Sequence, residues 1–381
     1  MEVKRKLSEF LKRETVLTVA ILLAIVSAVM IPPDREYVGY IDFRTLSILF
    51  CLMTVMAGLQ KLGVFRNIAK TLLRHTQNTI QLAEVLVLLC FIFSMIITND
   101  VSLITFVPFT FIVLRLTGEE AVKKLAVPVI VLQTIAANLG SMLTPIGNPQ
   151  NLYLYGKTQM SAGTFILLML PYSLVSLLLL MICVVIVAKR SGIEVRGAEV
   201  LLTEDEKLEQ KKYLLPAYLL LFVLCLLTVA HMIPYPVTLV TVALAVLLLD
   251  RGTIIKVDYS LLLTFVGFFI FIGNMGRMPA FCDFLQKIIG GREVMTAVIA
   301  SQVISNVPAA LLLSGFTENI TALIIGTNLG GLGTLIASMA SLISYKQVAR
   351  QIPGEKKKYF GWFTIANIVF LMILVLENCL L

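Results

Sequence analysis

Ionisable side chains are scarce in this chain of 381 residues: 14% of the residues are charged, and the only histidines are His75 and His231. No HExxH, GxSxG or P-loop pattern occurs, so zinc hydrolase, serine hydrolase and ATP-driven mechanisms have no residues to carry them. The six cysteines form no CxxC pair and mostly lie in apolar runs, which favours small buried hydrophobes over metal ligands. We therefore predict no enzyme and no cofactor apart from a coupling ion.

Apolar residues dominate instead, at 58% of the chain with a mean hydropathy of +0.93. Apolar runs long enough to be buried in a membrane predict an all-α polytopic membrane protein with about nine crossings and two re-entrant hairpins. The runs lie near 14–31, 43–60, 80–97, 101–116, 164–188, 213–231, 235–250, 258–277 and 361–381. The first run follows a basic segment but ends in no small-x-small cleavage site, so we interpret it as a retained helix.

Basic residues fall mainly in alternate short loops. With a cytoplasmic N-terminus, 25 of the 31 lysines and arginines lie inside, and the positive-inside rule favours this orientation. It places the C-terminus outside, in what we expect to be a prokaryotic plasma membrane. The net charge of +8 then reflects topology, and we expect membrane lipid and no nucleic acid as partner.

A polar motif occurs twice inside apolar sequence, as NLGSMLTPIGNPQNL at 138–152 and NLGGLGTLIASMASL at 328–342. Each copy follows an Asp-aromatic helix start, at Asp42 and Asp258, and a second polar break, TND at 98–100 and SNVP at 305–308. Glycine, proline and asparagine breaks repeated in this order indicate internal repeats of a transporter. Five crossings separate the two Asp-aromatic helices, so the second repeat is predicted to be inverted.

The predicted domains are a first repeat at 1–188, a charged cytoplasmic linker at 189–212 and a second repeat at 213–381. The first contains scaffold helices at 14–60, an interfacial helix at 61–78, a hairpin at 80–116, a broken helix at 123–152 and a helix at 164–188. The second contains a scaffold at 213–277, a hairpin at 293–316, a broken helix at 318–345 and a last helix at 361–381. Hairpin arms of about 18 and 15 Å in the second repeat are too short to cross a core of about 30 Å.

Non-helical backbone survives at membrane depth only where protein or water satisfies it, so the four breaks predict a polar site. Its candidate substrate-binding residues are Thr98, Asn99, Thr144, Pro145, Asn148, Asn151, Ser305, Asn306, Thr334, Ser338 and Ser341. Its candidate ion-coupling residues are Asn99, Asp100, Asn138, Gly147, Asn306, Asn328 and Gly333. We expect each hairpin tip to face the break of its own half, with Na⁺ near Asn99 and Asp100 and near Asn306. For any single side chain the alternative is an interhelical hydrogen bond.

Asp100 is the only acidic residue at either tip, and an ionisable group at membrane depth indicates function. It is a candidate for binding Na⁺, taking up a proton or repelling a second anion. The alternative is that its carboxylate caps the helix that it begins. Pro145, Asn148 and Asp100 have no polar or proline match in the second half, so the tighter ion site is predicted in the first.

With TND at 98–100, TPIGNPQN at 144–151 and SQVISNVP at 301–308, the chain resembles the ion transporter superfamily. This group contains arsenite pumps, NhaD-type Na⁺/H⁺ antiporters, citrate transporters and divalent-anion/Na⁺ symporters. The motifs are similar to the arsenite-pump and citrate-transporter-like branch, close to small bacterial anion permeases. The symporter branch has Ser-Asn-Thr at both tips, and here the final Thr is absent from both.

The resemblance implies a secondary transporter for a small anion, such as a carboxylate or oxyanion, coupled to Na⁺ or H⁺. It also implies an elevator-like motion and a homodimer. Alternatives are a Na⁺/H⁺ antiporter that uses Asp100, an arsenite or metalloid exporter, and, from other classes, a channel or a membrane-embedded enzyme.

Overall fold

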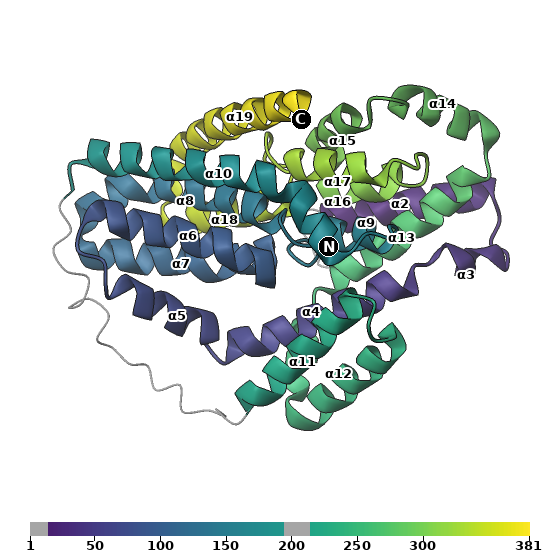
Figure 1. Ribbon diagram of the computed structural model, residues 1–381, viewed down its shortest axis with the longest axis horizontal. Helices are drawn as coiled ribbons and strands as arrows, with labels where there is room; N and C mark the ends of the chain where they lie inside the picture. Colours follow the sequence, from purple (N-terminus) through teal and green to yellow (C-terminus); the bar gives the residue numbers. More distant parts are fainter. Residues whose placement is uncertain (1–13, 194–213) are drawn as a thin grey trace, which may run out of the picture.

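A computed structural model describes residues 14–193 and 214–381, and within them the regular elements are all helices (Figure 1). Within the described residues, seven helices are long and apolar enough to cross a membrane, and shorter apolar helices accompany them. The all-α polytopic fold is therefore confirmed. The basic residues before residue 14 and most of the predicted linker lie outside the described residues.

Helices in the first half follow the predicted order. They are α2 (Thr15–Met30), α3 (Glu36–Tyr40), α4 (Phe43–Lys61), α5 (Val64–Leu73), α6 (Thr79–Ile97), α7 (Asn99–Thr117), α8 (Glu119–Ser141), α9 (Pro149–Gly156) and α10 (Ala162–Ser191). Helices α6 and α7 form the first hairpin, and α8 and α9 form the first broken helix. Each arm of this hairpin has 19 residues, about 28 Å of helix, so its depth in the bilayer stays a prediction.

The second half repeats this order with shorter hairpin arms. It contains α11 (Leu214–Val229), α12 (Tyr235–Leu249), η2 (Arg251–Lys256), α13 (Tyr259–Gly276), α14 (Pro279–Ile289), α15 (Glu293–Ile304), α16 (Asn306–Leu313), α17 (Ile320–Leu329), α18 (Met339–Gln351), η3 (Pro353–Glu355) and α19 (Lys356–Leu380). The hairpin arms α15 and α16 have 12 and 8 residues, about 18 and 12 Å, too short to cross about 30 Å of hydrocarbon.

The Asp-aromatic starts are matching helix caps. Asp42 accepts a hydrogen bond from the Thr45 amide at 2.9 Å, and Asp258 accepts one from the Leu261 amide at 3.0 Å. A carboxylate in this position satisfies an amide that the first helical turn leaves free. Both predicted boundaries are therefore correct, and α4 and α13 are equivalent in the two halves.

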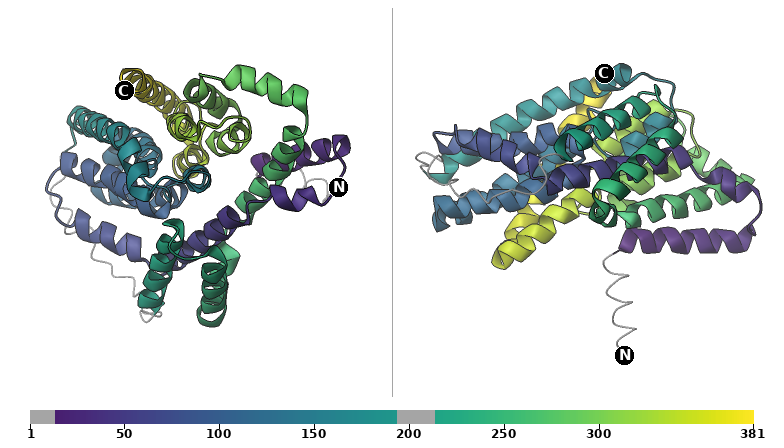
Figure 2. Two further views of the ribbon diagram at one scale, coloured as in Figure 1. Left: turned by 45° about the vertical axis from the view of Figure 1, so that its right-hand side comes forward. Right: turned by 90° about the horizontal axis from the view of Figure 1, so that it is seen from below.

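Helices of both halves combine into two groups. The scaffold group contains α2, α3, α4, α11, α12, η2 and α13, with α2 packed on α13 and with α11 and α12 packed on α4. The hairpin group contains α6 to α10 and α15 to α19, with α8 against α18 and α19 and with α9 against α16 and α17. In Figure 2 (left), the purple and green scaffold helices form a diagonal row beside the hairpin group. Each group thus draws on both halves of the sequence.

Short amphipathic helices follow α4 and α13. Helix α5 buries Phe65, Ala69 and Leu73, which recur every four residues on one face. Its counterpart α14 was not predicted, although Phe281, Leu285 and Ile289 repeat the same spacing. Both helices connect the scaffold group to a hairpin, because α6 follows α5 and α15 follows α14.

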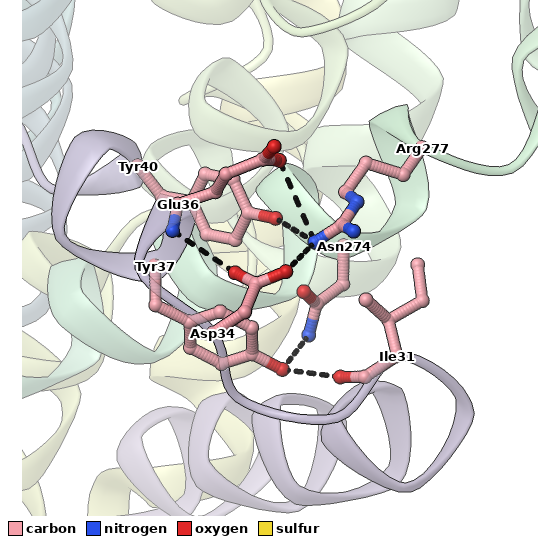
Figure 3. A network of polar contacts seen from close by, with 7 residues as sticks. All are labelled: Ile31, Asp34, Glu36, Tyr37, Tyr40, Asn274 and Arg277. Atoms are coloured by element: carbon pink, nitrogen blue, oxygen red, sulfur yellow. Dashed lines mark hydrogen bonds and ion pairs between the residues drawn. The ribbon is translucent and has the colours of Figure 1, made fainter.

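A polar network joins the segment after α2 to the end of α13 (Figure 3). Arg277 Nη1 lies 2.7 Å from Asp34 Oδ2 and 3.5 Å from Glu36 Oε2, and it donates to the Tyr40 hydroxyl at 3.1 Å. The hydrogen bond from Arg277 lowers the pKa of Asp34. Beside it, Asn274 donates to the Tyr37 hydroxyl at 2.8 Å. These contacts hold α3 against α13 within the scaffold group.

Candidate functional site

The two hairpin tips have the same backbone conformation. Thr98 has φ 74° and ψ 153°, and Ser305 has φ 74° and ψ 154°. A positive φ is uncommon for a residue with a side chain and costs about 1–3 kcal/mol, so the surrounding structure has to hold it. Strained backbone at equivalent positions marks both tips as parts of the site.

Each tip is held by the break of its own half, as predicted. The Asn99 amide donates to the Gly147 carbonyl at 3.1 Å, and the Asn306 amide donates to the Ala337 carbonyl at 2.9 Å. Further back, the Thr144 hydroxyl donates to the Met95 carbonyl at 2.5 Å, and the Thr334 hydroxyl donates to the Gln302 carbonyl at 3.1 Å. Hydrogen bonds at matching positions therefore attach each tip to residues 142–148 or 330–338, where the helices are broken.

The side chains of the two broken helices pair across the halves, which the sequence did not predict. Asn148 Nδ2 donates to Asn328 Oδ1 at 3.1 Å, and Asn328 Nδ2 donates to Asn151 Oδ1 at 2.6 Å. All three side chains are buried. The side-chain amides of Asn148 and Asn151, at the start of α9, thus both form hydrogen bonds with the side-chain amide of Asn328 at the end of α17.

The mirror arrangement surrounds Asn138 at the end of α8. The Ser338 hydroxyl donates to Asn138 Oδ1 at 2.9 Å, and Asn138 Nδ2 lies 3.4 Å from the Ser341 hydroxyl. Asn99 Nδ2 donates to the same Asn138 oxygen at 3.2 Å, which brings the first tip into the network. Asn306 Nδ2 lies near Gly331, whose carbonyl accepts a hydrogen bond from Asn138 at 3.4 Å. Asn138 therefore connects the first tip to the second broken helix.

Glycine allows this close approach. A Cβ atom on Gly140 would overlap the Phe91 carbonyl and the Ser94 hydroxyl, and one on Gly330 would overlap the Ser301 side chain. Ser94 and Ser301 are equivalent positions on α6 and α15. Both copies of the NLG motif thus need glycine because a hairpin arm packs directly on the backbone.

A residue that the sequence analysis passed over closes the second break. Gln302 Nε2 donates to the Gly330 and Leu332 carbonyls at 3.1 and 3.0 Å, and its Oε1 accepts from the Thr334 amide at 2.9 Å. The equivalent residue in the first half is Met95, which carries no amide. Gln302 lies in the motif SQVISNVP, and a position-by-position comparison of the two hairpin arms shows that it has no polar equivalent in the first half.

A cavity of about 210 Å³ lies beside the first tip, between the scaffold group and the hairpin group. Thr98, Asp100 and Asn148 line it from the hairpin group, and Lys256 and Asp258 line it from the scaffold group, with Leu49, Met53 and Leu261 among its apolar walls. Asn99, Asn138 and Asn306 do not line it. The first half thus contributes the hairpin-tip side chains that face open space.

The Asp100 carboxylate faces this cavity without a hydrogen bond to any described residue. Asp100 lies in the first turn of α7, but no side chain caps that helix. Instead, Asn99 Oδ1 accepts a hydrogen bond from the Asp100 amide at 2.9 Å. Asp100 thus makes no capping hydrogen bond, but its carboxylate lies in the first turn, where the helix dipole favours a negative charge.

The remaining predicted residues are placed less centrally. Pro145 is buried in the first break, and the Gly147 backbone packs against Ser141. Gly333 has φ 104°, a conformation that favours glycine, and it lies against Gln302. Thr334 is exposed and lines no part of the cavity described above.

Comparison with known proteins agrees with this architecture. A family model described as a citrate transporter matches residues 7–321. An uncharacterized transporter of Methanocaldococcus jannaschii is 30% identical over 342 residues, covering 89% of each chain. The inner membrane protein YbiR of Escherichia coli is 32% identical over 320 residues, covering 82% of each. A silicon efflux transporter of Oryza sativa subsp. japonica is 31% identical over 157 residues, covering 40% of this chain and 31% of its own length. This integral membrane protein belongs to the citrate transporter family.

Proposed function

We propose that the protein is a secondary transporter that carries a small anion, a carboxylate or an oxyanion, together with Na⁺ or H⁺. The observation that carries this proposal is the cavity between the scaffold group and the hairpin group. Helices α7, α9 and α13 begin at its wall, and the positive ends of helix dipoles favour a negative ligand. Lys256 adds a full positive charge. A site for an anion thus lies at the boundary between the two groups.

Asp100 is the proposed site of ion coupling. Its carboxylate shares the cavity with Asp258, but Asp258 is engaged as a helix cap whereas Asp100 is not. A cation or proton at Asp100 would offset the negative charge that an anion brings into the cavity. Binding of the ion and binding of the anion would then favour each other.

The proposed motion is an elevator-like movement of the hairpin group against the scaffold group. Hydrogen bonds between Asn148 and Asn328 and between Asn138 and Ser338 join the broken helices of both halves. The hairpins and broken helices are therefore suited to move as one body. In the proposed orientation, with a cytoplasmic N-terminus, the loop at 251–257 is cytoplasmic. The cavity, which Lys256 and Asp258 line, then lies on the cytoplasmic side of the first tip.

Two other functions fit particular observations. A Na⁺/H⁺ antiporter is favoured by the two carboxylates, Asp100 and Asp258, that face one cavity. A metalloid exporter is favoured by the similarity of part of the chain to a silicon efflux transporter. Both use the same site, so the substrate has to be identified by transport.

Reconstituted proteoliposomes test the proposal. Uptake of radiolabelled citrate and other small carboxylates and oxyanions is measured with an imposed Na⁺ gradient, an imposed pH gradient or neither. We expect one of the two gradients to drive accumulation. We expect Asp100→Asn to reduce the stimulation of uptake by that gradient at least about fivefold, which is the lower end of the usual coupling between two ligands. Asp283→Asn in α14, an exposed carboxylate far along the chain from the tip, is the matched control.

The outcomes separate the three functions. Unchanged dependence on both gradients in Asp100→Asn would contradict the coupling role. Proton movement driven by Na⁺ without anion uptake would identify an antiporter. Movement of silicic acid or arsenite, with no uptake of any charged anion, would identify a metalloid exporter.

A further inference from the structure

A groove of about 540 Å³ runs along the hairpin group between α8, α10 and α19, away from the transport cavity. These three helices pack against one another. The lining residues are Lys123, Lys124, Pro128, Val131, Leu132, Cys183, Ile186, Val187, Arg190, Ser191, Lys358, Trp362 and Ala366. Neither the repeats nor the proposed transport mechanism uses this surface.

Polarity changes along the groove in the same direction on all three helices. Basic residues lie at one end, at Lys123 on α8, Arg190 on α10 and Lys358 on α19, and the lining beyond them is mainly apolar. From Lys123 to Leu132 the groove follows nine residues of α8, about 13 Å of helix. One leaflet contributes about half of a hydrocarbon core of about 30 Å. The groove therefore matches one leaflet, with its basic end at the surface assigned to the cytoplasm by the charge distribution.

Two of the basic residues have no acidic partner among the described residues. Lys124 lies 3.1 Å from Glu120, and Lys358 lies 3.1 Å from Glu355. No described carboxylate lies within ion-pair distance of Lys123 or Arg190, and both side chains are exposed. The basic end of the groove thus presents two exposed basic side chains on neighbouring helices, neither of which forms an ion pair with a described carboxylate.

We propose that this groove binds an anionic phospholipid of the cytoplasmic leaflet. The lipid phosphate lies between Lys123 and Arg190, and an acyl chain lies against Val131, Leu132 and Val187. Basic pockets between membrane helices on the cytoplasmic side bind such headgroups, because charge attraction adds to burial of the acyl chain. Trp362, which is 44% exposed, lies one turn of α19 beyond Lys358, at the depth where tryptophan contacts headgroups. This site is independent of the proposed function.

Trp362 allows a direct test, because it is the only tryptophan in the chain. The protein is reconstituted in phosphatidylcholine containing a small, varied fraction of dibrominated phosphatidylglycerol or dibrominated phosphatidylcholine, and quenching of tryptophan fluorescence is measured. We expect the anionic lipid to reach half-maximal quenching at a much lower fraction than phosphatidylcholine. The ratio should be roughly fivefold for each of the two residues Lys123 and Arg190. In Lys123→Gln/Arg190→Gln we expect the two lipids to quench alike.

The control is Arg74→Gln/Arg251→Gln, which removes the same charge at two exposed positions outside the groove. It should retain the preference of the unaltered protein. Thermal unfolding in detergent and size-exclusion elution establish that each variant is folded. Equal quenching by both lipids in the unaltered protein would overturn the proposal, as would a preference that survives the groove substitutions. Absence of quenching by either lipid would also overturn it, since another part of the protein would then cover Trp362.

Discussion

The hydrogen bond between Asn148 and Asn328 should make a measurable contribution to the free energy of unfolding. It joins the broken helices of the two halves over 3.1 Å, with both side chains buried. Asn328→Ala removes this bond, the 2.6 Å bond to Asn151 and the 2.7 Å bond to the Ile324 carbonyl. Asn148→Ala removes the shared bond together with contacts inside its own half.

The expected magnitude depends on what the unpaired groups do in a membrane. In a soluble protein, each buried partner left without a hydrogen bond costs about 1–3 kcal/mol. Interhelical hydrogen bonds in a membrane protein average only about 0.6 kcal/mol, with a maximum near 1.7, because the unfolded chain in lipid also finds partners. With two interhelical bonds lost, we expect Asn328→Ala to destabilise by about 1–3 kcal/mol. The shared bond alone should contribute about 0.6 kcal/mol.

A double-mutant cycle isolates this contribution. Unfolding free energies of the unaltered protein, Asn148→Ala, Asn328→Ala and the double variant are measured by reversible SDS titration in mixed micelles. A reference cycle combines Asn328→Ala with Asn319→Ala, a cap at the opposite end of α17. Distant sites without shared partners usually add to within about 0.3–0.5 kcal/mol, so the reference coupling should fall there. A coupling for Asn148 and Asn328 no larger than the reference would refute the pairing across the halves.

Two further predictions test the packing and the proposed motion. Gly140→Ala should destabilise the protein by about 1–3 kcal/mol in the same titration, because its Cβ atom would overlap the Phe91 carbonyl. Gly361→Ala on α19, where a Cβ atom meets nothing within 4 Å, should not destabilise, and equal effects at the two sites would contradict this account. Residues 45 and 156 approach closely where α4 of the scaffold group meets α9 of the hairpin group. In a variant without native cysteines, we expect oxidation of Thr45→Cys/Gly156→Cys to link the two helices and to stop transport until the disulfide is reduced. Full transport by linked protein would exclude movement between the two groups.

Much of the fold follows from local patterns in the sequence. Proline, glycine and asparagine interrupt apolar sequence at 142–148, and Gly330, Gly331 and Gly333 interrupt it at 330–338, so the helices break at both places. Asp42 and Asp258 mark helix starts because capping depends only on neighbouring residues. Helix α14 was missed although Phe281, Leu285 and Ile289 repeat the four-residue spacing of the buried face of α5. Local signals thus located the helix caps and both breaks.

The partners of the buried asparagines could not be predicted in the same way. Repeated spacing within each half suggested that each break serves its own tip, and the backbone bonds of Asn99 and Asn306 agree. The side chains of Asn138 and Asn328, however, pair with the opposite half, at Ser338 and Asn148. That choice depends on how the broken helices pack together, which no spacing along the chain encodes.

The same comparison explains why two copies of one motif need not bind the same ligand. In the second half, the Gln302 amide donates to the Gly330 and Leu332 carbonyls, and in the first half the Asn151 amide donates to the Met142 and Thr144 carbonyls. The two tips differ more: the first presents Asp100 to a cavity, whereas the equivalent residue of the second, Val307, is apolar and buried. We therefore propose that the coupling ion binds in the first half, beside Asp100.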